Sequence, residues 1–311
     1  MKNKALRAAG MILTIVSLGF ICYRIARLDL SDIKIDFSVS SVLILLLALI
    51  LQTFSVIILG ILFARNVGKG TGDREVPLKD AVMVYCRANL GKYIPGNVFQ
   101  YVERNLFFSS YGIRHLDTVI ASVLEILCLI VGACILSAVF GDFNVIREAA
   151  ESYGNFIPVI CIIIVAVLIA GIFVLKKKKK SLADIAARIG ERGGARLVII
   201  DVIAYTLILL LMGAVAVISY YAFMVPGETQ VEPLGLLGAY IAAWLCGFVI
   251  IGAPGGIGVR EAVFTLIYIN TPYLDTVLAL SVLLRVISVI ADIFAYFVAK
   301  ICDYYPLHKK D

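Results

Sequence analysis

Two segments of the chain place a Pro-Gly step among charged side chains inside an otherwise apolar stretch. The first, residues 87–104, contains Gly91-Lys92-Tyr93-Ile94-Pro95-Gly96, and the second, residues 252–264, contains Pro254-Gly255-Gly256. Pro removes a backbone donor and clashes with the preceding turn, while Gly permits a positive φ. We therefore expect each segment to break its helix. Broken backbone at membrane depth is tolerated only where it is buried in protein or lines a wet cavity.

A broken helix exposes a helix N-terminus, whose free N–H groups and dipole attract anions. Basic side chains flank both breaks, so a phosphate is the ligand that this arrangement favours. The alternative is two kinked helices whose glycines allow close packing, but two breaks beside charge favour a binding site. The predicted substrate-binding residues are Arg87, Lys92, Tyr93, Pro95, Gly96, Asn97, Glu103 and Arg104 at the first break, and Pro254, Gly255, Gly256, Gly258, Arg260 and Glu261 at the second.

The composition places these breaks in a membrane protein. Of 311 residues, 61% are hydrophobic and only 16% charged, against roughly 45–50% and about 25% in soluble domains. Such a chain is neither an ordinary cytosolic enzyme nor disordered. Apolar runs such as 40–64, 156–175 and 197–223 each exceed the roughly 18 residues that indicate a spanning helix. We predict an all-α polytopic membrane protein forming a single membrane domain, residues 1–311.

The order of the apolar segments predicts the topology. Six spanning helices are expected at 8–26, 40–64, 117–140, 156–175, 197–223 and 274–301. The broken stretches, 81–111 and 234–270, are interpreted as re-entrant hairpins; eight or more full crossings are the alternative. Lys and Arg gather at both termini and around 65–79 and 176–196, which makes these parts cytoplasmic. A multi-pass protein of a bacterial plasma membrane, with both termini cytoplasmic, is expected.

The same order occurs twice with opposite starting sides, which predicts an inverted repeat of residues 1–150 and 151–311, with a substrate site near the midplane. Three ionisable residues, Glu125, Arg285 and Asp292, fall within predicted spans, where charges usually pair in the protein interior. Glu125 follows Pro95 by 30 residues and Arg285 follows Pro254 by 31. This equivalence predicts a Glu125–Arg285 pair, either functional or purely structural. Asp201 is expected to snorkel or cap at the cytoplasmic end of its helix.

Residues 91–96 and the segment Ala253-Pro254-Gly255-Gly256-Ile257-Gly258-Val259-Arg260-Glu261-Ala262 resemble the two signatures of the lysylphosphatidylglycerol synthase transmembrane-region family, also called flippase-like domain proteins. The resemblance covers nearly the whole chain in the length and order of its segments. It implies an integral membrane protein that moves or handles an anionic lipid. In bifunctional relatives this membrane domain is followed by a soluble aminoacyl transferase. Because the present sequence ends at Asp311, lipid aminoacylation is not expected.

These observations predict a lipid translocase rather than an enzyme. Its partner is a membrane lipid with an anionic headgroup, either a phospholipid or a polyprenyl-phosphate-linked lipid. No cofactor, metal or nucleic acid is expected, and a homo-oligomer is left open. Glu103, Glu125 and Glu261 are candidates for proton coupling. The alternatives are a small-solute or ion secondary transporter and an intramembrane lipid-modifying transferase.

Overall fold

A computed structural model of the protein describes residues 38–68, 76–93, 99–142, 194–223, 231–250 and 253–304, and all regular elements within them are helices. Four helices are long and apolar enough to cross a membrane, which confirms the predicted all-helical membrane class and the spans at 40–64, 117–140, 197–223 and 274–301. The predicted spans 8–26 and 156–175 lie outside the described residues. The four helices are α2 (Val39–Gly68), α5 (His115–Phe140), α9 (Gly194–Phe223) and α12 (Leu274–Tyr304).

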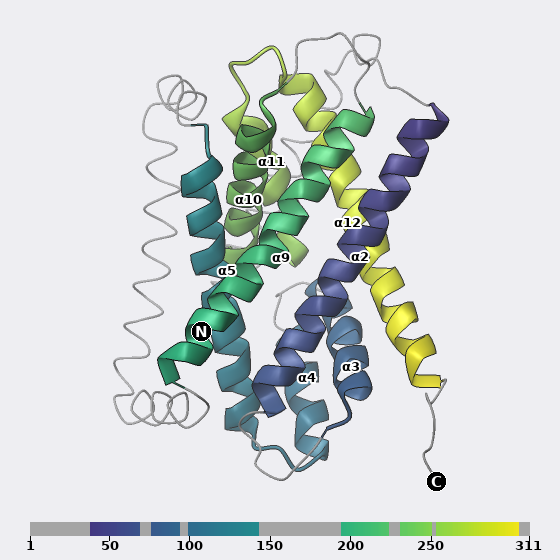
Figure 1. Cartoon of the computed structure of the whole chain (residues 1–311), viewed down its shortest axis with the longest axis vertical. Coiled ribbons are helices and arrows are strands. Elements are labelled where there is room, and N and C mark those ends of the chain that lie inside the picture. Colours follow the sequence, from purple (N-terminus) through teal and green to yellow (C-terminus); the bar gives the residue numbers. More distant parts are fainter. Residues whose placement is uncertain are drawn as a thin grey trace, which may run out of the picture.

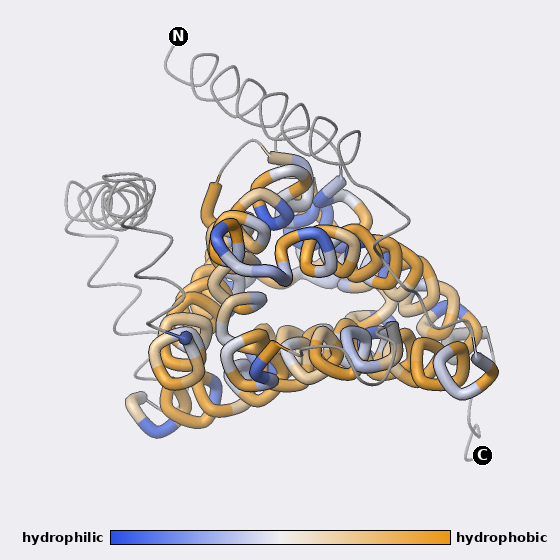
Figure 2. The backbone as a smooth tube through the Cα atoms, turned by 90° about the horizontal axis from the view of Figure 1, so that it is seen from above, coloured by the Kyte–Doolittle hydropathy of each residue, from blue (hydrophilic) through white to orange (hydrophobic). Residues whose placement is uncertain are grey.

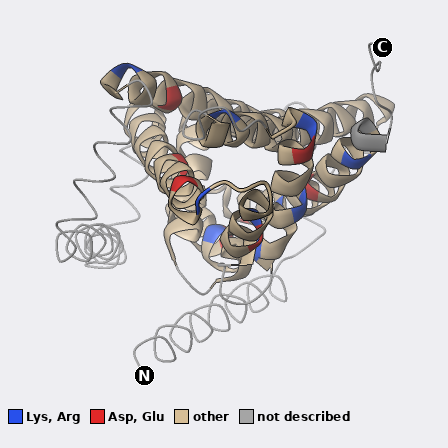
Figure 3. Cartoon of the chain, turned by 90° about the horizontal axis from the view of Figure 1, so that it is seen from below, with Lys and Arg blue, Asp and Glu red and all other residues tan. Residues whose placement is uncertain are grey.

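The outer face of the bundle carries large apolar side chains, and some polar side chains are buried inside it. On α2 the large side chains Leu43, Ile50 and Phe54 are exposed, whereas Gln52 and Ser55 of the same helix are buried. The tube in Figure 2 is correspondingly apolar along most of the long helices. Figure 3 shows that most of the described part is free of Lys, Arg, Asp and Glu. An apolar exterior suits contact with lipid, and the buried polar groups must find partners inside the protein.

The two Pro-Gly segments are broken into short helices. The first stretch forms α3 (Leu78–Leu90), the one-turn 3₁₀ helix η1 (Gly91–Tyr93) and α4 (Phe99–Ser110). The second forms α10 (Pro233–Val249), η2 (Pro254–Gly256) and α11 (Val259–Ile267). The break at η2 requires glycine, because Gly255, Gly256 and Gly258 have φ values of 56°, 73° and 84°. Pro95, Gly96 and Asn97, at the first break, lie outside the described residues.

The short helices lie at opposite ends of the bundle. In Figure 1, α3 and α4 occupy the lower half, beside the end of α2 and the start of α5, while α10 and α11 occupy the upper half. The 3₁₀ turns η1 and η2 are in contact with each other. A Cβ atom placed on Gly255 would lie only 3.1 Å from Cδ1 of Tyr93. The long helix α12 packs on both α3 and α11, so a single helix runs past both broken segments.

The rest of the bundle is a close-packed scaffold for these turns. Leu129 of α5, Tyr205 and Leu209 of α9 and Ile241 of α10 belong to one buried apolar cluster. The start of α10 is fixed by Pro233 in its first turn and by Glu232, whose carboxylate accepts a hydrogen bond from the Gly235 N–H. Whether residues 1–150 and 151–311 form an inverted repeat stays a prediction, because each half includes residues outside the described ranges.

The packing can be tested at Gly238, which lies where α10 contacts the end of α5. A Cβ atom on Gly238 would lie 2.6 Å from backbone atoms of Phe140 and Gly141, which cannot rotate away. We expect Gly238→Ala to lower the free energy of unfolding by about 1–3 kcal/mol, as overpacked cores do. Gly68→Ala is the control, because a Cβ atom there meets nothing within 4 Å. Chemical unfolding of the detergent-solubilised variants measures both, and equal stability of the two would contradict the described packing.

Candidate binding pocket at the helix breaks

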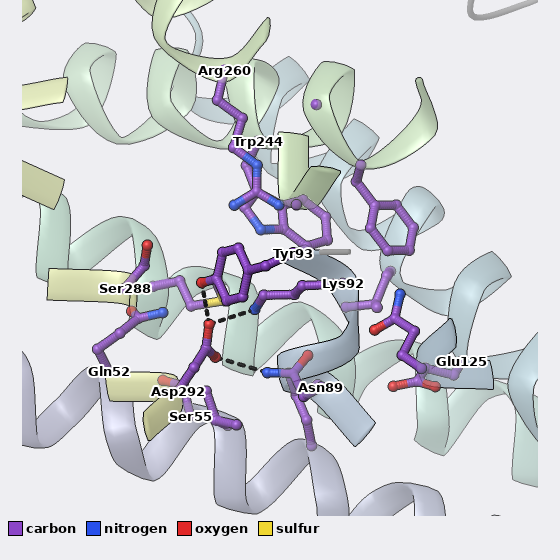
Figure 4. A pocket seen from close by; sticks show the side chains of 18 of the residues that line it. Gln52, Ser55, Asn89, Lys92, Tyr93, Glu125, Trp244, Arg260, Ser288 and Asp292 are labelled. Atoms are coloured by element: carbon purple, nitrogen blue, oxygen red, sulfur yellow. Dashed lines mark hydrogen bonds and ion pairs between the residues drawn. The ribbon is translucent and has the colours of Figure 1, made fainter. Parts of the chain in front are cut away.

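A polar pocket lies where the two broken segments meet. Its empty space is about 860 Å3, open solvent included, and its walls come from α2, α3, η1, α4, α5, α9, α10, η2, α11 and α12. Figure 4 shows Gln52, Asn89, Trp244 and Ser288 around it together with charged side chains. The charged residues that line it are Lys92, Arg104, Arg260, Arg285, Glu125 and Asp292. A pocket with this lining, inside an apolar bundle, is the best candidate for a binding site among the described residues.

Asp292 attaches α12 to the first broken segment. Its carboxylate accepts hydrogen bonds from Asn89 Nδ2 at 2.7 Å and from the Tyr93 hydroxyl, and Lys92 Nζ lies 2.7 Å from its Oδ2. The three interactions are drawn as dashed lines in Figure 4. Since the Asp292 side chain is only 2% exposed, these partners replace the water that a carboxylate needs. The negative charge of Asp292 is therefore satisfied by the protein itself.

Arg285, two turns earlier on α12, holds the second broken segment. Its Nη1 and Nη2 groups both donate to the Gly255 carbonyl at 3.1 Å, and its Nε lies 3.7 Å from Oε1 of Glu261. The carbonyl of Gly255 is free to accept because η2 is too short to use it within a helix. One helix thus binds both turns, η1 through Asp292 and η2 through Arg285.

The protein itself caps part of the N-terminus of α11. Glu261 accepts a hydrogen bond from the Gly258 N–H at 2.8 Å, and the N–H groups of Gly256 and Ile257 donate to Ala253 and Pro254 carbonyls. The N–H groups of residues 256–258 therefore donate within the protein, and Glu261, three residues into the helix, stabilises this end of the dipole as in a capping box. Binding of an anion by the first-turn N–H groups of α11 stays a prediction.

Glu125 pairs with Arg104 and not with Arg285, so the predicted Glu125–Arg285 pair is wrong. Arg104 Nη1 lies 2.8 Å from Oε2 of Glu125, and the Tyr85 hydroxyl donates to Oε1 at 2.5 Å. The Arg104 guanidinium also lies over the ring of Tyr85, 3.8 Å from its centroid. Both charged side chains are almost fully buried, at 2% and 4% exposure. The basic group next to Glu125 is thus Arg104 of α4, and Arg285 contacts the second broken segment instead.

Arg260 is different, because no carboxylate among the described residues forms an ion pair with it. Its side chain passes so close to Gly247 that a Cβ atom there would lie 2.3 Å from its Cγ, and a Cβ atom on Gly256 would lie 2.7 Å from its Nε. The guanidinium lies 5.4 Å from the centroid of the Trp244 ring and lines the pocket. Its buried Nε has no hydrogen-bond partner, which also holds for Nε of Arg104 and Arg285, but those two guanidinium groups each contact a carboxylate. The two glycines thus admit a cation that the described protein leaves uncompensated.

The remaining predicted residues lie elsewhere. Arg87 and Glu103 pair with each other at 2.5 Å outside the pocket, with exposures of 46% and 36%. Of the second motif, Pro254, Gly256 and Gly258 shape the turn, and Glu261 lines only a smaller adjoining pocket. Asp201 does not snorkel or cap: it is fully buried and ion-paired with Arg65 of α2, which corrects that prediction.

The sequence reasoning missed several residues that line the pocket, among them Gln52, Ser55, Asn89, Trp244 and Ser288. Gln52 and Ser55 interrupt an apolar run and could have been found by that polarity, and Trp244 is the single Trp of the chain. Asn89 and Ser288 carry no such signal. Searches against known protein families and against curated proteins found no match. Within the described ranges, no group of three His, Cys, Asp or Glu side chains could hold a metal ion.

The buried pair Arg104–Glu125 and the exposed pair Arg87–Glu103 allow a matched test of how much an ion pair contributes to stability. Glu125→Gln leaves Arg104 charged and unpaired in the interior, so we expect the free energy of unfolding to fall by about 3–5 kcal/mol. Glu103→Gln removes the same charge from a solvated pair and is expected to change it by about 1 kcal/mol or less. Chemical unfolding in detergent measures both values. Similar losses in the two variants would show that Arg104 and Glu125 are not paired in the interior.

Proposed function

We propose that the protein is a lipid translocase that moves a lipid with an anionic phosphate headgroup across a bacterial plasma membrane. One observation carries the proposal. Arg260 presents an uncompensated guanidinium to a polar pocket inside an apolar bundle, where an unpaired charge is costly. A phosphate supplies the missing negative charge, and an Arg fork binds it through two parallel hydrogen bonds. The resemblance of residues 91–96 and 253–262 to the motifs of flippase-like domain proteins also favours a lipid translocase.

The proposal includes a topology. Helices of 13 and 12 residues, α3 and α4, are about 20 Å long or less, well short of the roughly 30 Å hydrocarbon core. They suit a re-entrant hairpin that enters from one side, and α10 with α11 suits a second hairpin from the other side. The lower end in Figure 1, where α2 ends and α9 begins near Arg65 and Arg196, is the cytoplasmic end. Both termini are then cytoplasmic.

In this proposal the headgroup enters the pocket while the tails stay in the bilayer. The phosphate binds at Arg260, beside the Trp244 ring and the contact of η1 with η2. Because α12 holds both turns, through Asp292 and Arg285, a shift of either segment relative to α12 would open the pocket toward one side only. Alternating exposure of a midplane site is the general mode of transporters built from broken helices. The protein performs no covalent chemistry and needs no cofactor.

Reconstitution tests this function. Purified protein in vesicles of zwitterionic lipid with a trace of acyl-labelled phosphatidylglycerol should move the label between leaflets faster than protein-free vesicles. Arg260→Gln should slow it about tenfold or more, because a charged hydrogen bond contributes about 1.5–3 kcal/mol. Arg87→Gln, an Arg outside the pocket, is the matched control and should keep the wild-type rate.

Two outcomes would contradict the function. If a folded Arg260→Gln variant transports the lipid at the wild-type rate, Arg260 does not bind the headgroup during transport. Flux of a soluble anion such as inorganic phosphate, without movement of the lipid, would identify a small-solute transporter instead.

A further inference from the structure

The basic side chains around the pocket outnumber the acidic ones by one. Lys92, Arg104, Arg260 and Arg285 line the pocket and carry four positive charges. Glu125 and Asp292 line it as well, and Glu261 lines the adjoining smaller pocket, giving three negative charges. The segments next to the two turns, 94–98 and 251–252, contain no charged residue. Among the described residues, the site therefore carries one positive charge in excess.

This count holds whichever way protons are shared within the pairs. Lys92 lies 2.7 Å from Asp292, Arg104 lies 2.8 Å from Glu125, and Nε of Arg285 lies 3.7 Å from Glu261. A base and an acid in contact have a net charge of zero both as an ion pair and after the proton has moved between them. The excess charge thus belongs to Arg260, the one guanidinium of the pocket with no ion-pair partner among the described residues.

We propose that the pocket selects a headgroup with a single negative charge, the phosphodiester of a phospholipid, over a doubly charged phosphomonoester. This inference rests on the proposed function and names its substrate class. A monoanion at Arg260 leaves the occupied site electrically neutral, whereas a dianion leaves one buried negative charge without a partner, which is strongly unfavourable in a low dielectric. A phosphodiester keeps two non-bridging oxygens, which match the two N–H groups of the guanidinium fork.

The wild-type protein tests this without any variant. Vesicles of zwitterionic lipid receive a trace of phosphatidylglycerol or of phosphatidic acid with the same labelled acyl chains, and protein-free vesicles correct for spontaneous movement. A phosphomonoester has a second pKa near 6, so only about 3% of it is singly charged at pH 7.5. Phosphatidylglycerol should then move about thirtyfold faster at pH 7.5 and less than twofold faster at pH 5.5.

A charge change in the pocket should reverse the preference. Glu125→Gln keeps an amide in place of the carboxylate and leaves the guanidinium of Arg104, which holds its proton, without its partner. The excess rises to two charges, so at pH 7.5 phosphatidic acid should move faster than phosphatidylglycerol. Glu103→Gln makes the same charge change outside the pocket and should keep the wild-type ratio. Retained helical circular dichroism and an unchanged elution volume establish that each variant is folded.

The outcomes separate this inference from the function on which it rests. Equal rates for the two lipids at pH 7.5 overturn the charge selection while the translocase stands. A pH-independent ratio, or a folded Glu125→Gln variant with the wild-type ratio, also overturns the charge selection alone. If neither lipid moves faster than in protein-free vesicles, the translocase function fails, and the charge selection fails with it.

Discussion

An ionised side chain in a medium that holds no water must find a partner of opposite charge, and this requirement organises the described structure. Asp201, Glu125 and Asp292 are buried in a bundle whose outer face is apolar, and each contacts a basic group from another helix. Lipid tails are as apolar as the helices, so helices in a membrane associate through close packing and through polar contacts between them. The ion pairs supply such contacts between α9 and α2, α5 and α4, and α12 and η1.

The pairing on α12 links the fold to the site. Asp292 holds the first broken segment and Arg285 holds the second, so both turns meet against one helix. Once the three carboxylates around the pocket have taken partners, Arg260 is the cation left over. Gly256, one of the glycines expected to expose backbone N–H groups, together with Gly247 leaves room for the Arg260 side chain to reach the pocket. In the proposed function, binding depends on the charge of this side chain.

The sequence predicted the long helices and the two breaks well, because an uninterrupted apolar run or a Pro-Gly step is a local property. Partners across the bundle were not predictable in the same way. The Glu125–Arg285 pair was inferred from equivalent spacing, yet which base reaches Glu125 depends on the rotation and depth of α4, which spacing does not determine. The cap that Glu261 places on the Gly258 N–H could have been foreseen, since Glu261 stands three residues after Gly258, the spacing of a capping box.

Neutralisation of Arg260 by a lipid phosphate can be tested by electron cryo-microscopy of the protein in nanodiscs that contain phosphatidylglycerol, because the map reports both the headgroup and the path of the tails. We expect phosphate density within hydrogen-bond distance of the Arg260 guanidinium, with acyl chains that leave the pocket sideways into the bilayer. A protein carboxylate paired with Arg260, or a pocket closed to lipid with the phosphates bound only at the surface, would contradict it.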